Sequence, residues 1–202
     1  MAKIKESPIK QIQKLHNNFQ SLIGREIEVE DFYKIKMHFL VNKVNYIKDK
    51  NGLPFVLVQY KSLSNSKFTS YDKIAIYNYK GKLVAYLNYQ IYPNYNYIKM
   101  VETDNKYRGR HLATQMLKFV ENYTKKNFVD KDVTLICLHD DSKRSNINSN
   151  LPFYSNLNYK ACSENSRPSD TFIEMYKEYD DLITYNNSAN YKQKGRKFVK
   201  EK

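Results

Sequence analysis

The stretch V-E-T-D-N-K-Y-R-G-R-H-L-A-T, from Val101 to Thr114, ends an apolar strand, passes through a short basic loop and begins a helix. The apolar positions from the helix start onward recur at i, i+4, i+7, i+8 and i+11, which is the spacing of a helix with one buried face. These positions are Leu112, Met116, Phe119, Val120 and Tyr123. We therefore place Arg108 to Ala113 at a helix N-terminus. The free N–H groups and the helix dipole there suit a phosphate, and three cations add to them: Lys106, Arg108 and Arg110.

The run Y-R-G-R-H-L-A-T-Q-M-L resembles the acyl-CoA pyrophosphate loop of the GNAT acetyltransferase superfamily. That loop usually reads Arg or Gln, two residues, Gly, one residue, then Gly or Ala. Arg108 fills the first position and Ala113 the last, whereas His111 stands where the family most often has its second Gly. The resemblance implies that the strand end pairs with the pantetheine arm and that the loop binds the diphosphate. The residues implied are Val101, Glu102, Thr103, Arg108, Gly109, Arg110, His111, Leu112, Ala113 and Thr114.

A second segment, L-P-F-Y-S-N-L-N-Y-K-A-C from Leu151 to Cys162, resembles the later GNAT motif F/L-Y-x-x-L-G-F. Asn158 and Tyr159 replace its Gly and Phe. The two motifs occur in the family's order and are separated by a helix and a strand, D-V-T-L-I-C-L-H. The resemblance spans residues 73–179. It implies an α+β fold, an α/β/α sandwich with a mixed, mostly antiparallel sheet flanked by helices.

Along the chain we expect three parts: a helical and hairpin element over residues 1–60, the acyltransferase domain over 61–180 and a basic, mobile tail over 181–202. A helix is expected within residues 1–27, ended by Gly24, with a stripe of apolar residues. The stripe is Ile9, Ile12, Leu15, Phe19 and Leu22. Residues 28–48 fit either an alternating strand or a buried helix. The family's two helices after its first strand have no room between Tyr60 and Lys73.

Turn signals predict the next elements. Asn51-Gly52 predicts a hairpin between V-N-Y-I-K and F-V-L-V-Q-Y, with Pro54 near the start of the second strand. K-G-K at residues 80–82 predicts a second hairpin, and Y-I-K-M-V-E-T supplies a third strand before the loop. T-F-I-E-M-Y-K-E-Y is expected to form the last strand of the domain.

Composition bounds the class of protein. The 202 residues carry a formal charge of +13 with a pI near 9.5, and 41% of them are hydrophobic. No run is long enough to cross a bilayer and no secretory signal is seen, so we expect no membrane partner. Cys137 and Cys162 have neither metal-ligand nor disulfide spacing, so a cytoplasmic protein without a metal is expected. The positive charge attracts acyl-CoA and nucleic acid alike.

The resemblance implies direct attack of a primary amine on the thioester of acetyl-CoA. Tyr154 matches the family tyrosine that protonates the departing thiolate, and Glu102 and His139 are the candidate bases. The chain is thus expected to be an N-acyltransferase, with acetyl as the group transferred. The acceptor stays open, as does the choice between monomer and homodimer. The alternative is a basic domain on the same scaffold that binds nucleic acid or the ribosome without catalysis. Interleaved tyrosines such as Tyr89 would then stack on bases.

Overall fold

The computed structural model divides into two compact units, and each is described here by itself. The first unit holds residues 1–90 and 100–118, and the second holds residues 91–99 and 119–202. The structure describes residues 7–63, 71–92, 95–127, 135–140, 150–161, 173–178, 191–194 and 197–200. Strand β6 (Tyr95–Thr103) and helix α2 (Leu112–Asn127) each contribute residues to both units.

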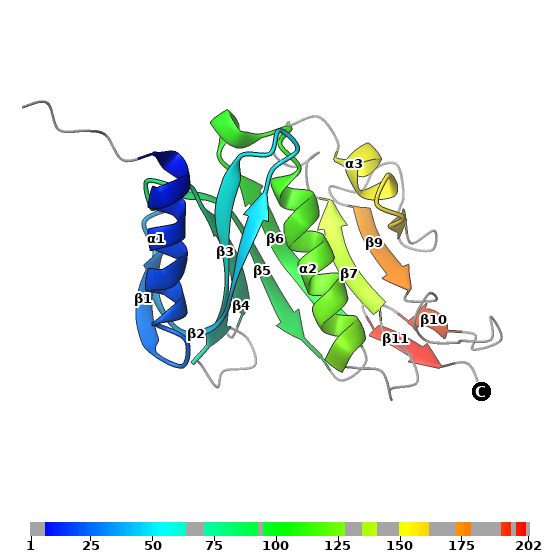
Figure 1. Ribbon diagram of the computed structural model, residues 1–202. Helices are drawn as coiled ribbons and strands as arrows, with labels where there is room; N and C mark the ends of the chain where they lie inside the picture. The colour runs from blue at the N-terminus through cyan, green and yellow to red at the C-terminus, as the bar shows by residue number, and fades with distance from the viewer. Residues whose placement is uncertain are drawn as a thin grey trace, which may run out of the picture. The chain divides into compact units, whose positions relative to one another are not determined.

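The first unit is an antiparallel meander with one helix packed against it (Figure 1). Each strand from β1 to β5 pairs with the next in chain order, which confirms both predicted hairpins. Helix α1 contacts β2 and β3. The elements are α1 (Pro8–Gln20), β1 (Glu26–Glu30), β2 (Lys36–Lys48), β3 (Pro54–Ser62), β4 (Asp72–Tyr77) and β5 (Leu83–Ile91).

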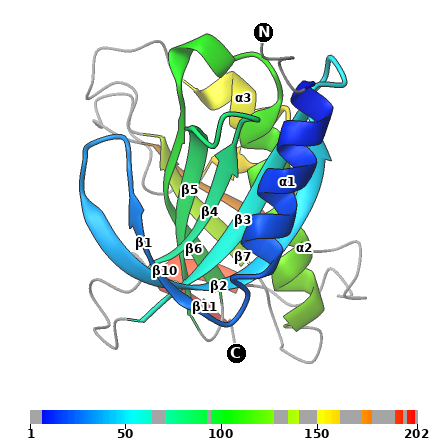
Figure 2. The ribbon, with the colours of Figure 1, turned by 60° about the vertical axis from the view of Figure 1, so that its left-hand side comes forward.

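The stretch of residues 28–48, which fitted either a strand or a helix, forms the end of β1 and all of β2. The two strands make a long hairpin whose loop projects beyond its neighbours (Figure 2). Alternate residues of β2 enter the core, among them Phe39 at 2% and Val41 at 0% exposure, while the residues between them face outward. Burial of every second residue is typical of a half-buried strand. Of the two alternatives for this stretch, the alternating strand was therefore correct and the buried helix was wrong.

Helix α1 begins where Ser7 caps it, because the Ser7 hydroxyl accepts a hydrogen bond from the Lys10 backbone N–H at 3.4 Å. Its stripe is buried against the core through Ile12, which is 0% exposed, and through three partly buried residues further along. These are Leu15, Phe19 and Leu22. The prediction was wrong for Ile9, which lies in the first turn and is 57% exposed, so the buried stripe starts one turn later. Full burial of such a side chain stabilises the fold by about 1.5–3 kcal/mol.

Strands β3 to β5 are buried on both faces, and their tyrosines belong to the core. The hydroxyls of Tyr60 and Tyr77 lie 2.9 Å apart, and burial raises the pKa of Tyr77 to about 12. Tyr86 and Tyr89 are both 0% exposed. These four tyrosines therefore fill sheet positions and are not available for stacking on nucleic acid bases.

The second unit contains a parallel crossover, at the place where the sequence predicted a strand, a helix and a further strand in this order. Residues Tyr95–Ile98 of β6 pair in parallel with β7 (Leu135–Asp140), after the helix that joins them. Strand β7 pairs with β9 (Ile173–Glu178), and β9 with β8 (Lys160–Ala161), both antiparallel. Helix α3 spans Leu151–Ser155. One parallel pair among antiparallel ones gives the mixed sheet of an α+β protein.

The C-terminal segment, which we predicted to be a mobile tail, contains two short paired strands. Strand β10 (Tyr191–Lys194) pairs antiparallel with β11 (Lys197–Lys200). The expectation of a tail is corrected to that extent, and its mobility stays a prediction. The polar run over residues 141–149 and Cys162 lie outside the described residues. Among the helices that the structure describes, none is long and apolar enough to cross a membrane.

Candidate active site

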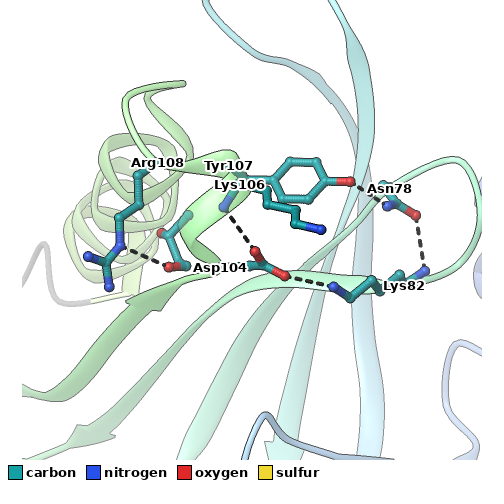
Figure 3. Close-up of polar contacts among 7 residues, drawn as sticks. Asn78, Lys82, Asp104, Lys106, Tyr107 and Arg108 are labelled. Atoms are coloured by element: carbon teal, nitrogen blue, oxygen red, sulfur yellow. Dashed lines mark hydrogen bonds and ion pairs between the residues drawn. The ribbon is translucent and has the colours of Figure 1, made fainter.

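The predicted loop between β6 and α2 has the expected order of strand end, turn and helix start. Strand β6 ends at Thr103, a short 3-10 turn η1 covers Asn105–Tyr107, and α2 begins at Leu112. Asp104 fixes the turn. Its carboxylate accepts from the Lys106 backbone N–H at 3.0 Å and pairs with the Lys82 ammonium at 2.7 Å (Figure 3). The hydrogen bond from Lys82 is the largest cause of a lowered pKa at Asp104.

Two residues of the loop have a left-handed backbone. Gly109 has φ of 70° and His111 has φ of 64°. His111 stands where the family most often has its second Gly, and it adopts the conformation that glycine would supply. Histidine, like Asn and Asp, is enriched in this region relative to other residues with a Cβ. The departure from the family pattern therefore leaves the backbone path of the loop intact.

The start of α2 presents unpaired backbone donors. The first hydrogen bond into the helix runs from the Gln115 N–H to the His111 carbonyl at 3.1 Å. The N–H groups of Leu112, Ala113 and Thr114 come before it and have no acceptor within the helix. Arg108 turns its Nε to the Thr103 carbonyl at 3.3 Å, as Figure 3 shows. Donors, dipole and cations together suit a phosphate.

The turn between β2 and β3 braces this loop by three contacts. The Arg110 guanidinium lies 3.5 Å from the Asp49 carboxylate, whose side chain is 0% exposed. The Lys50 N–H donates to the Arg110 carbonyl at 3.3 Å. The Gln115 side-chain amide donates to the Lys48 carbonyl at 2.8 Å. Asp49 also accepts from two N–H groups of its own turn, so one buried carboxylate links the turn to the loop.

A tyrosine fixes the loop from its other side. The Tyr107 hydroxyl accepts from the Asn78 side-chain amide at 2.8 Å, and Asn78 itself closes the β4–β5 turn by accepting from the Lys82 N–H (Figure 3). The Tyr107 ring packs edge-on against Phe55 at 6.1 Å, and the Arg110 guanidinium lies 5.1 Å from the ring centroid. The loop is therefore held by two separate turns of the same unit.

Glu102, the next-to-last residue of strand β6, is held by two tyrosine hydroxyls. Tyr86 donates to its Oε2 at 3.0 Å, and Tyr33 donates to its Oε1 at 3.4 Å. The Glu102 charge raises the pKa of Tyr33, and burial followed by the same charge raises that of Tyr86. Both hydroxyls therefore stay protonated and keep donating. Glu102 is partly buried and accessible to a substrate.

Glu102 opens into a pocket of about 710 Å³ within the first unit. Its walls come from the β1–β2 loop, the start of β5 and the end of β6 with the loop that follows. The lining residues are Glu30, Asp31, Phe32, Lys34, Lys82, Leu83, Glu102, Thr103, Asp104, Asn105, Lys106 and Arg108. The candidate base and two of the candidate phosphate-binding cations thus share one cavity.

The second unit holds the other two predicted catalytic residues. Tyr154 lies in α3, is 8% exposed and packs edge-on against Tyr159 at 6.0 Å. His139 lies in β7 opposite Glu174 of β9. Because these residues belong to the second unit and Glu102 to the first, their joint action stays a prediction.

The second motif also contains a left-handed residue in place of glycine. Asn158 has φ of 64°, and Tyr159, which replaces the family's Phe, is 2% exposed. The Tyr159 hydroxyl donates to Glu121 at 3.3 Å, and Lys177 pairs with Glu121 at 3.1 Å. Both substitutions in the motif thus preserve what the family residues supply, a left-handed turn and a buried ring.

Sequence reasoning missed the residues that hold the site in place: Asp31, Tyr33, Asp49, Asn78, Tyr86 and Tyr107. Only Asp49 gave a local signal, because an Asp two residues before Asn-Gly is typical of a turn closed by its side chain. In the part of the chain that the structure describes, no group of three His, Cys, Asp or Glu side chains could hold a metal ion.

Comparison with known proteins places the chain in a family. No curated protein matches it. Solved structures that resemble it include the PaiA N-acetyltransferase of Thermoplasma acidophilum in complex with coenzyme A, with 15% identity over 53% of this chain and a TM-score of 0.43. The aligned part spans 60% of that PaiA chain.

Two further structures are similar at the same level. Naa50 of Arabidopsis thaliana, in complex with the bisubstrate analogue CoA-Ac-MVNAL, is 17% identical over 53% of this chain and 72% of its own, with a TM-score of 0.41. A GNAT family acetyltransferase of Elizabethkingia anophelis with acetyl-CoA bound is 11% identical over 62% and 98%, with a TM-score of 0.45. The family model for the acetyltransferase (GNAT) family matches residues 45–148, just over half of the chain. The chain therefore belongs to the GNAT acetyltransferase family.

Proposed function

We propose that this chain is an N-acyltransferase that moves an acetyl group from acetyl-CoA to a primary amine. The observation that carries the proposal is the braced loop at the start of α2, where left-handed Gly109 and His111 precede unpaired N–H groups. Such an arrangement fits the diphosphate of CoA, because oriented backbone donors bind phosphate oxygens without a side-chain ligand. The CoA complexes of the family's solved members agree with this use.

The proposed reaction has two proton transfers. The amine nitrogen forms a bond to the acetyl carbon, the carbon–sulfur bond breaks, and the sulfur leaves as a thiolate. Glu102 is the proposed acceptor of the amine proton, and the two tyrosine hydroxyls hold its carboxylate in place. Tyr154 is the proposed donor to the thiolate, since a phenol is protonated at neutral pH. His139 is the alternative base.

The test is release of free CoA thiol from acetyl-CoA in the presence of primary amines, followed by detection of the acetylated amine by mass. Glu102→Gln removes the base while its amide oxygen still accepts from a tyrosine. We expect kcat to fall about 10²–10⁴-fold, the usual contribution of general base catalysis, with acetyl-CoA binding retained. Full activity in Glu102→Gln would remove Glu102 from the mechanism and leave His139 as the base.

A further inference from the structure

The wall of the pocket that faces the loop comes from a part of the chain outside the family match. Residues Glu30 to Lys34 lie at the end of β1 and in the loop of the β1–β2 hairpin (Figure 2), and the family model begins at residue 45. This hairpin loop contributes four of the lining residues, with Glu102 and Thr103 of β6 also in the lining. Because the tip of the hairpin lies outside the matched residues, it can make this site particular to this chain.

Half of the charged residues that line the pocket are paired with one another. Glu30 pairs with Lys34 at 2.8 Å, and Asp104 pairs with Lys82. Among the residues that the structure describes, two lining carboxylates have no ion pair, those of Asp31 and Glu102. The lining cations Lys106 and Arg108, the candidate phosphate-binding residues, likewise make no ion pair among the described residues. Beside them the pocket presents two negative charges that no protein cation neutralises by contact.

Asp31 is fixed in place with one oxygen left over. Its Oδ1 accepts from the backbone N–H of Tyr33 at 2.9 Å and from that of Ile35 at 3.0 Å. No described residue donates a hydrogen bond to its Oδ2, and this oxygen is not among the fully buried atoms that lack a partner, so it is reached from the pocket that Asp31 lines. The charge of Asp31 acts on Lys73, but the two side chains make no ion pair in the described part of the chain. A carboxylate oxygen that faces a pocket and has no protein donor can bind a cation from outside.

The two carboxylates act on the same groups and are therefore close together. Tyr33 donates its hydroxyl to Glu102 and its N–H to Asp31. Both charges raise the pKa of Tyr33 and of Tyr86. Phe32, next to Asp31 in the sequence, also lines the pocket, and its ring packs edge-on against Tyr86 at 5.2 Å. An aliphatic chain with a positive charge at each end matches a pocket with two such carboxylates and an aromatic wall.

We propose that the acceptor of this enzyme is a small diamine, with one ammonium bound by Asp31 and the other amine reacting beside Glu102. The inference rests on the proposed function. The charge of Glu102 is lost when it takes the proton of the reacting amine, whereas that of Asp31 is not, so a second positive charge on the substrate stays paired throughout. Phe32 and Leu83 would cover the methylene groups between the two amines.

The test uses three amines that each carry four methylene groups and differ only at the far end: 1,4-diaminobutane, pentylamine and 5-aminopentanoate. The far ends are an ammonium, a methyl group and a carboxylate. We expect kcat/KM for the diamine to exceed that for pentylamine by about tenfold or more, the usual effect of a charge-assisted hydrogen bond, and 5-aminopentanoate to be the poorest of the three.

Asp31→Asn is the matched variant, because an amide oxygen at Oδ1 can still accept both turn hydrogen bonds while the charge is gone. It should bring the ratio of diamine to pentylamine close to one. Glu28→Gln is the control on the same hairpin, since Glu28 pairs with Lys36 at 2.8 Å and does not line the pocket. It should leave the ratio unchanged. Thermal stabilisation by acetyl-CoA, measured for each protein, shows that the variants are folded.

A ratio near one in the unmodified protein, or a ratio that Asp31→Asn leaves unchanged, would overturn the inference. So would the absence of turnover with all three amines. In each of these cases stabilisation by acetyl-CoA would leave the proposed function standing. Loss of both acetyl-CoA stabilisation and amine turnover would instead refute the proposed function itself.

Discussion

The left-handed residues of the loop allow a sharp test of how it binds phosphate. If backbone N–H groups make the contacts, the side chain of His111 is dispensable and the backbone of Gly109 is not. Three substitutions separate these roles: His111→Gly, Gly109→Ala and Gly109→Pro. All three act on residues with φ between 64° and 70°.

The expected changes in the free energy of unfolding follow from the backbone φ angles. His111→Gly removes a left-handed strain of about 1–2 kcal/mol and adds about 0.5–1 kcal/mol of chain entropy to the unfolded state. The free energy of unfolding should therefore stay within about 1 kcal/mol of the original. Gly109→Ala places a Cβ with no atom within 4 Å, so it should cost about 1–2 kcal/mol through φ alone and keep its N–H. Gly109→Pro fixes φ near −65° and removes the N–H.

The assay is acetyl-CoA binding by calorimetry, with denaturant unfolding measured in parallel. Loss of one hydrogen bond to a charged group costs about 1.5–3 kcal/mol, so Gly109→Pro should weaken binding roughly 10- to 100-fold. His111→Gly should change the Kd less than about threefold, and Gly109→Ala should fall between them. If His111→Gly weakens binding more than Gly109→Pro, the histidine is a direct ligand and backbone recognition is refuted.

Three further predictions concern residues away from the loop backbone. Tyr154→Phe keeps the ring but removes the proton donor, so kcat should fall about 10²–10⁴-fold with KM for acetyl-CoA little changed; full kcat, or unfolding, would refute its role as the acid. Asp49→Ala should lower the free energy of unfolding by about 1–3 kcal/mol and weaken acetyl-CoA binding. Asp49→Asn keeps an acceptor for the turn and should preserve most of the stability. Equal losses of stability in both variants would show that the fold depends on the negative charge that pairs with Arg110. Lys73 is fully buried with a lowered pKa, chiefly because burial removes its hydration, so the unfolded chain binds more protons in the window below the ordinary lysine pKa. Stability should rise with pH through that window, and Lys73→Met should raise stability at pH 7 and abolish the rise; an unchanged pH profile would contradict the assignment.

The parts of the fold that depend on local pattern were predictable from the sequence. The stripe of α2, the Asn51-Gly52 hairpin and the strand before the loop each follow from spacing or turn chemistry within about ten residues. The alternation of residues 28–48 was equally visible, but a short apolar run does not tell strand from helix until its pairing partner is known. The exposure of Ile9 likewise depends on where α1 meets the sheet and not on its own spacing.

The residues that support the site were not predictable, because each acts through a contact distant in the sequence. Asp49 contacts Arg110 across 61 positions, and Tyr33 reaches Glu102 across 69. The family motif identified the loop, but a local motif does not predict these contacts with distant residues. His111 is a departure from the family motif, and its φ of 64° shows that it adopts a left-handed backbone conformation that glycine favours.

The proposed function depends most directly on acetyl-CoA being a ligand of this chain. Thermal unfolding with millimolar acetyl-CoA, with CoA and with ADP as the control nucleotide measures this before any acceptor is known. A ligand that binds only the folded state at a hundredfold excess over its Kd stabilises it by about 2.7 kcal/mol. We predict a clear rise in Tm with acetyl-CoA and CoA and a much smaller one with ADP. No shift with acetyl-CoA, together with tight, salt-sensitive binding to an oligonucleotide, would contradict the account and favour a basic nucleic-acid-binding domain.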